Sequence, residues 1–220
     1  WSIPVNFYPY IIFPILGIDA DFEIKKYGYY PKGGGLVVIK FKNFLYKKIE
    51  LIERGKLEKI KILSFASEDL KIKKLAERQA EFAKNILEER LKEVDFDIEI
   101  AYFNTLSVGF ELNLCAYFSG NIRLWADALG EKYKTFEDVA KEASLKLLKE
   151  IDSNSCCDLH LADNLILYLA FLNGKIKTSQ ITDHTLTNIW VCENFLGKIF
   201  KIKDNFIERC FFNQSAILKA

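Results

Sequence analysis

The sequence contains no methionine and only two histidines, His160 and His184, among its 220 residues. It begins at Trp1, inside an apolar segment, and this start together with the missing methionine suggests a fragment or a sequence from which residues were omitted. With so few imidazoles, each one has to be weighed as a structural residue, a metal ligand, a proton carrier or a nucleophile.

The spacing of the cysteines argues against the usual cysteine-based functions. The five cysteines are an odd number and contain no C-x-x-C pair, so a disulfide framework is not expected and a reducing cytoplasm is predicted. The string "CCDLH" does not supply the four spaced ligands of a structural zinc site. We therefore expect these thiols to be buried as small apolar side chains.

Long apolar runs and an excess of charge are absent as well. No run is long enough to span a membrane and no secretory leader is recognisable, so the sequence predicts a soluble protein without a membrane partner. The net charge of +1 offers no general attraction for nucleic acid, and any such contact must come from a local patch. Because half of the residues are apolar, a folded core is expected, in one large or two small domains.

The patterns along the chain predict an α/β (α+β) fold of sheets and packed helices with one inserted module. Prolines limit residues 2–16 to short helical pieces, and a glycine turn separates two strands. We expect a cyclase-type division into residues 1–56 and 129–220, with an inserted β-α-β-β domain at 57–128. The predicted strands are 19–30, 36–42, 47–55, 59–65, 96–103, 109–120, 121–129, 175–181, 198–203 and 205–212, and the predicted helices are 69–94, 135–151, 160–172 and 184–197.

Two short stretches combine a histidine with other polar residues at helical spacing. His160 and Asp163 are three residues apart and would share a helix face, as a metal or nucleotide site or as an ordinary polar surface. His184 and Asn188 are four apart, just after Thr182, where a helix start exposes backbone N–H groups that suit phosphate. A neutral imidazole there could attack phosphorus, or be a satisfied residue in a capped helix.

The glycine-rich string "YYPKGGGLV" does not have the pattern of a phosphate-binding P-loop. Its lysine precedes the glycines, no serine or threonine follows them, and a strand rather than a helix comes next. A turn that lets two backbone segments approach closely is the expected structure.

Four strings occur in the order and spacing of one known family. "GYYPKGGGLV", "ADALGEKYK", "HLADNLILYLA" and "TDHTLTNIWVCENFLG" resemble the RNA 3′-terminal phosphate cyclases over essentially the whole chain. The resemblance implies repeated sheet-plus-helix units similar to enolpyruvate-transferase-like folds. It also implies an ATP-dependent conversion of RNA 3′-phosphate ends into 2′,3′-cyclic phosphates, with Mg²⁺ or Mn²⁺, through a covalent histidine-AMP and an RNA-adenylate.

The family's functional residues fall on particular positions of this chain. The resemblance implies that His184, in an H-x-x-T-N motif with Asn188 at the ATP site, is the nucleophile. It implies that Asp163 binds ATP and the metal ion. It places His160 against the adenine and Pro4 on the opposite wall of the adenine pocket. A family segment with a glycine-rich loop and a second metal-binding carboxylate has no counterpart in this sequence, which is therefore expected to be a fragment.

The expected partners are RNA 3′-phosphate ends and ATP, and a homodimer is one option for the oligomeric state. The alternative is a non-catalytic, cyclase-like scaffold of ribosome biogenesis, although such proteins lack the histidine found here at His184. The basic residues Lys71, Lys73, Lys74 and Arg78 could dock RNA along one helix, or form a solvated face diluted by glutamates.

Overall fold

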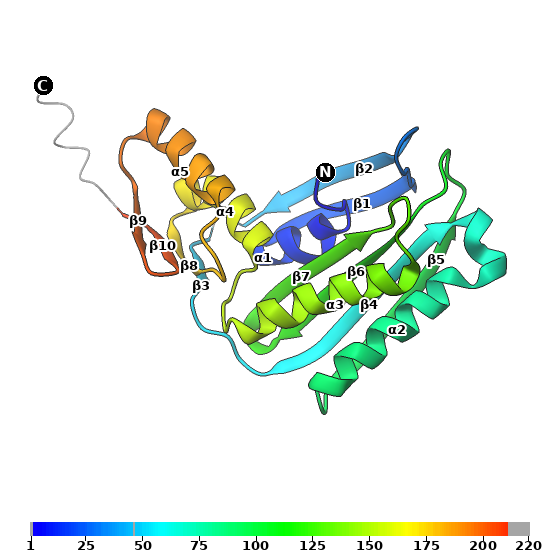
Figure 1. Ribbon diagram of the computed structural model, residues 1–220. Helices are drawn as coiled ribbons and strands as arrows, with labels where there is room; N and C mark the ends of the chain where they lie inside the picture. The colour runs from blue at the N-terminus through cyan, green and yellow to red at the C-terminus, as the bar shows by residue number, and fades with distance from the viewer. Residues whose placement is uncertain (1, 46, 211–220) are drawn as a thin grey trace, which may run out of the picture. The chain divides into compact units, whose positions relative to one another are not determined.

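A computed structural model describes residues 2–45 and 47–210 of the chain (Figure 1). The contacts divide these residues into two compact units. Unit 1 comprises residues 2–45 and 55–153, and unit 2 comprises residues 47–54 and 154–210. Both contain sheets and helices, so the predicted mixed α/β class is confirmed. Among the described residues, none of the helices has the length and apolar character needed to cross a membrane.

Unit 1 is built around a mixed four-stranded sheet in the order β5-β4-β6-β7. β4 and β5 run parallel, and the helix α2 makes the crossover that a parallel pair requires. β6 pairs antiparallel with β4 on one side and with β7, the next strand along the chain, on the other. The elements are β4 (Leu57–Ser67), α2 (Leu75–Arg90), β5 (Asp95–Phe103), β6 (Phe110–Phe118) and β7 (Ile122–Leu129).

A second helix, α3 (Phe136–Asp152), packs beside α2 against the same sheet (Figure 1). Its first turn has a capping box, since the Thr135 hydroxyl accepts from the Asp138 N–H and the Asp138 carboxylate accepts from the Thr135 N–H. The sequence placed this helix outside the insert of residues 57–128. In the structure it contacts β6, β7 and α2, so the packed unit extends beyond that boundary. The division into a cyclase domain and an insert stays a prediction.

The helix α2 is shorter than the predicted helix of residues 69–94. Lys74 has a left-handed backbone (φ 49°), which interrupts an α-helix, and residues Glu68–Lys73 form a 3₁₀ turn instead. Lys71 and Lys73 therefore precede the helix that carries Arg78, so the basic residues do not line one continuous helix as the sequence suggested.

The chain before residue 45 covers the other face of the sheet. Ser64 bonds to the backbone of α2, whereas the next residue, Phe65, faces the opposite way and contacts the ring of Tyr27. The ring of Phe7 likewise packs edge-on against Trp125 at 5.8 Å. This part contains a π-helical turn (Tyr8–Ile12), α1 (Phe13–Leu16), β1 (Ile18–Lys26) and β2 (Leu36–Phe44). β1 and β2 are the two strands predicted on either side of the glycine turn, and they form an antiparallel pair.

Unit 2 has its own four-stranded sheet, in the order β3-β8-β10-β9, with two helices. β3 and β8 are parallel, and β10 pairs antiparallel with β8 and β9. β3 is much shorter than the predicted strand of residues 47–55, and residues 211–212 of the last predicted strand lie outside the described part. The elements are β3 (Ile49–Leu51), α4 (Leu159–Leu172), β8 (Gly174–Lys177), α5 (Asp183–Leu196), β9 (Phe200–Lys203) and β10 (Phe206–Arg209).

The predicted end of α4 is confirmed and has a clear physical cause. Asn173 leaves the helical conformation with φ 66°, and Gly174 follows with φ 143°. A Cβ at Gly174 would lie 2.0 Å from the backbone oxygen of Ile49. Glycine here allows β3 to lie directly alongside the chain that leaves α4. The five cysteines lie within the described residues and form no disulfide bonds, and four of them are buried as expected.

Candidate active site

The candidate site lies in unit 2, where the first turns of α4 and α5 meet. α4 is capped by Asp158, whose carboxylate accepts from the backbone N–H of Leu161 at 2.8 Å. α5 is capped by Thr182, whose hydroxyl accepts from the N–H of Thr185 at 3.0 Å, while the Thr185 hydroxyl accepts from the N–H of Thr182. The start of each helix is therefore capped by a side chain at its own N-terminus, independently of contacts between the two helices.

Asp163 joins the two helices. Its Oδ1 accepts hydrogen bonds from the hydroxyl of Thr182, at 2.8 Å, and from the hydroxyl of Thr185. A second connection runs from the side-chain amide of Asn188 to the backbone oxygen of Asp163, at 3.0 Å. We call these three bonds the Asp163 clasp. It holds the start of α5 against α4 through a carboxylate, and hydrogen bonds to charged groups are stronger than neutral ones.

His184 is the second residue of α5, one turn before Asn188. It is exposed, and no hydrogen bond or ion pair to its imidazole is found within residues 2–45 and 47–210. The residues of this helix that face inward are Thr185, Ile189 and Cys192. The imidazole therefore lies at the positive end of a helix whose position is fixed by the Asp163 clasp, in contact with solvent and open to a ligand.

His160 is the second residue of α4 and is also exposed. Its backbone oxygen accepts a hydrogen bond from the side-chain amide of Asn164 at 2.8 Å. The imidazole of His160 takes no part in this bond. The buried side of the helix carries Leu161 and Leu165. His160 and Asp163 are thus on the polar side of α4, but Asp163 is half-buried and bonded whereas His160 is in solvent.

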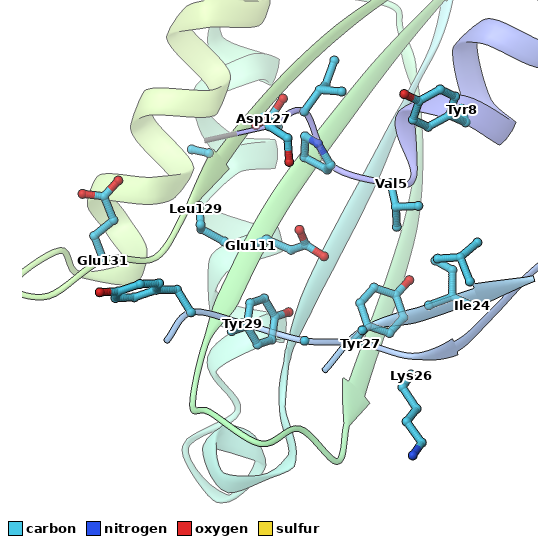
Figure 2. Close-up of a pocket in the computed structure, with 18 of the residues that line it drawn as sticks. Val5, Tyr8, Ile24, Lys26, Tyr27, Tyr29, Glu111, Asp127, Leu129 and Glu131 are labelled. Atoms are coloured by element: carbon cyan, nitrogen blue, oxygen red, sulfur yellow. The ribbon is translucent and has the colours of Figure 1, made fainter. Parts of the chain in front are cut away.

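Pro4 belongs to unit 1, where it is one of the residues that line a cavity. Figure 2 labels Tyr8 and Tyr27 in the lining of the same cavity. The structure brings together His184, Asp163 and Asn188 in unit 2, with His160 on the same helix as Asp163. The role of Pro4 as one wall of an adenine pocket stays a prediction.

The residues described do not by themselves make a site for Mg²⁺ or Mn²⁺. Among them there is no group of three histidine, cysteine, aspartate or glutamate side chains placed to hold a metal ion. Asp163 is a single carboxylate, and its Oδ1 already accepts two hydroxyl bonds. Such ions prefer several oxygen ligands, so Asp163 could provide only one of them.

Two residues of the site were not identified as functional from the sequence. Thr185 was not singled out, and Thr182 was recognised only as a possible cap. The capping-box spacing of Thr182 and Thr185 is a visible signal for a helix start. It gives no sign that both hydroxyls also bond a carboxylate on another helix. Thr187 of the H-x-x-T-N motif bonds within its own helix, to the backbone oxygen of Asp183 at 2.7 Å.

The structure is that of a mixed α/β protein. Its exposed histidine lies at the start of a helix that the Asp163 clasp holds in place, an arrangement suited to binding a phosphate-bearing ligand. The family model of "RNA 3'-terminal phosphate cyclase" matches residues 1–202. Proteins with this name from Thermococcus onnurineus and Pyrococcus furiosus are 36% and 37% identical to the chain over 92% of its length. A third, from Staphylothermus marinus, is 36% identical over 89% of the chain.

The chain therefore belongs to the RNA 3′-terminal phosphate cyclase family. It spans 60% of the Thermococcus onnurineus relative and 59% of the Pyrococcus furiosus relative.

Proposed function

We propose that the protein to which this chain belongs converts an RNA 3′-terminal phosphate into a 2′,3′-cyclic phosphate at the expense of ATP, with His184 as the nucleophile. The observation that carries the proposal is the position of His184 at the start of α5, exposed and next to the Asp163 clasp. Membership of the family supports the reaction class.

The chemistry proposed for His184 is nucleophilic transfer of AMP. A ring nitrogen attacks the α-phosphorus of ATP, a P–N bond forms, and the bond to pyrophosphate breaks. An oxygen of the RNA 3′-phosphate then attacks the same phosphorus and releases the histidine. Finally the neighbouring 2′-hydroxyl attacks the RNA phosphorus and AMP leaves, so a poor leaving group has been exchanged for a good one.

The start of α5 supports phosphate binding beside this nucleophile. The first N–H groups of a helix have no acceptor within the helix, and the helix dipole favours negative charge there. The Thr182 cap uses only the N–H of Thr185. Asp183 and His184 precede it, so their N–H groups are proposed to face the phosphates of ATP.

The Asp163 clasp is proposed to position the nucleophile. Thr185 follows His184 directly and is bonded to Asp163, and Asn188 holds the next turn of α5 to the same residue. Preorganising a nucleophile in this way lowers the cost of reaching the reactive geometry. His160 is proposed to contact the adenine, and Asp163 to provide one oxygen to Mg²⁺ or Mn²⁺.

Covalent labelling tests the first step. The full-length protein is incubated with ATP labelled at the α-phosphate and Mg²⁺ or Mn²⁺, and acid-labile label on the protein is measured. The His184→Ala variant is expected to take up none, because the P–N bond cannot form. The Glu81→Gln variant, which changes an exposed acid on α2, is the control, and we expect it to be labelled fully. Label that survives His184→Ala would rule out this residue, and no label on the unaltered protein would favour the scaffold alternative.

The later steps are tested with two RNA substrates that carry a 3′-phosphate. An RNA with a normal terminal 2′-hydroxyl is expected to give the cyclic phosphate and AMP. A matched RNA with a 2′-deoxy terminal nucleotide is expected to accumulate as the RNA-adenylate, because the attacking hydroxyl is missing. Equal release of AMP from both substrates would contradict the proposed last step.

A further inference from the structure

Unit 1 contains a cavity of about 690 Å³ between its central sheet and the covering segment before residue 45 (Figure 2). Its volume is in the range of small-molecule sites, roughly 300–1,000 Å³. Its lining includes four tyrosines, Tyr8, Tyr27, Tyr29 and Tyr30. The floor is formed by the sheet and carries the carboxylates of Glu111 and Asp127.

The register of the sheet places these two carboxylates on one face. Glu111 pairs with Leu129 of β7, and Asp127 lies two residues before Leu129 on the same strand. The two residues are therefore diagonal neighbours, a relation with Cα atoms roughly 7–8 Å apart that long side chains bridge. Figure 2 shows the Glu111 carboxylate directed into the cavity, between Asp127 on one side and Tyr27 and Tyr29 on the other.

Glu111 is a buried acid without a cation. Its side chain is only 8% exposed, and within the described residues it takes part in no ion pair. Burial, followed by the charge of Asp127, raises its pKa to about 7, while Asn113 acts in the opposite direction. An acid in such a place has a high cost of ionisation that a bound cation would remove.

The basic residues around the cavity do not supply that cation. Lys134 and Lys146 both bind the carboxylate of Glu142, at 2.6 and 2.7 Å. Lys26 extends away from Glu111 (Figure 2). The lining therefore has a surplus of negative charge around Glu111.

The buried hydroxyl of Tyr29 is an independent observation that points to a ligand. The Tyr29 side chain is 7% exposed, and its hydroxyl is buried without a hydrogen-bond partner. Burial and the neighbouring Glu111 both raise its pKa, so it stays a neutral hydroxyl with an oxygen that can accept a hydrogen bond. Buried hydroxyls are normally paired, so an unpaired one that lines a cavity points to a partner from outside the chain.

We propose that this cavity binds an aliphatic amine in its ammonium form, with Glu111 accepting hydrogen bonds from the ammonium group. The alkyl chain packs against the tyrosine rings and the aliphatic side chains of Val5 and Leu129, and Asp127 adds negative charge at the floor. Aromatic rings also attract cations through their faces. The volume exceeds what a bare metal ion fills, and the described residues offer no group of three metal-binding side chains.

Calorimetric titration of the full-length protein with 1,4-diaminobutane, in about 150 mM salt to suppress surface binding, tests the proposal. We expect saturable binding of one diamine per chain and none of 1,4-butanediol, its neutral counterpart of the same length. Glu111→Gln is expected to weaken binding at least tenfold. Glu81→Gln, which removes an exposed acid on α2, is the matched control and should leave it unchanged.

Several results would overturn the proposal. Equal affinity in Glu111→Gln, equal binding of the diol, or no saturable diamine binding would each do so. Saturable Mg²⁺ binding that is lost in Glu111→Gln, without diamine binding, would replace the amine by a divalent cation. If circular dichroism shows that Glu111→Gln does not fold, Tyr29→Phe and Asp127→Asn carry the test, with weaker diamine binding expected in both and unchanged affinity refuting it. His184→Ala should bind the diamine normally, so this readout is independent of the adenylation reaction.

Discussion

Because Glu111 is a buried acid, we expect the folding stability of the protein to depend on pH, and the substitution Glu111→Gln tests this expectation. The pKa of Glu111 is about 7 in the folded protein, against an ordinary value of 4.5, chiefly because it is buried. Between these two values the folded state holds a proton that the unfolded state has lost. Stability therefore falls as the pH rises from about 4.5 to about 7, and this contribution is constant above that range.

The size of the effect follows from the same two values. One pKa unit corresponds to about 1.4 kcal/mol, so the shift of Glu111 costs about 3 kcal/mol of folding free energy above pH 7. Glutamine has nearly the same shape and cannot ionise. We expect Glu111→Gln to have nearly the stability of the unaltered protein at pH 5 and to be more stable by about 3 kcal/mol at pH 8. The charged groups facing Glu111 are Asp127 from β7, and beside it the ionisable phenols Tyr27 and Tyr29.

Guanidinium unfolding at pH 5 and pH 8, without amines, measures this difference. Fluorescence of Trp125 reports on unit 1, because this side chain is 1% exposed and packs against Phe7. Glu81→Gln is again the control, and its stability should change equally little at both pH values. A Glu111→Gln variant that is less stable than the unaltered protein at pH 8 would refute the reasoning. It would mean that the ionised carboxylate is satisfied by interactions absent from this structure.

Two further substitutions test the local geometry. Thr185→Val keeps the shape of the side chain but removes both the capping-box acceptor and a donor to Asp163. We expect the free energy of unfolding to fall by about 1–2 kcal/mol. Thr187→Val is the control and should change it little, because the Thr187 hydroxyl bonds only within an exposed turn. Equal losses in the two variants would contradict the role of the clasp. Gly28→Ala places a Cβ 2.4 Å from a backbone oxygen in the glycine-rich turn and should lower the melting temperature. In Gly35→Ala the nearest atom to the new Cβ is 3.6 Å away, so the melting temperature should stay the same. A Gly28→Ala protein that melts normally would show that the turn adjusts freely.

The features that the sequence predicted well are those determined by neighbouring residues. The start of α3 after Thr135, the glycine turn between β1 and β2 and the end of α4 at Asn173 each depend on a few adjacent residues. The predicted start of α2 was wrong because apolar spacing continues through Ile72. That side chain is 96% exposed, since the left-handed Lys74 separates it from the helix.

Features that depend on contacts across the chain were not predictable in this way. Asp163 was read as a metal ligand from its resemblance to a motif, and its bonds to Thr182 and Thr185 span 19 and 22 residues. Glu111 alternates with apolar neighbours on β6 and looks like a solvent-facing residue. It is buried because the segment before residue 45 covers that face of the sheet, a packing that strand periodicity does not encode.

The Asp163 clasp also closes the chain between Asp163 and Thr182 into a loop, so that the ends of this segment are held together. The bond from Thr182 to Asp163 joins residues 19 apart, and the enclosed chain contains most of α4 and all of β8. Opening the start of α5 therefore releases the loop-closure constraint on this whole segment, not only one helix end. Amide protons of α4, β8 and the first turns of α5 should consequently exchange with solvent through one shared opening, so that this region unfolds as one cooperative element.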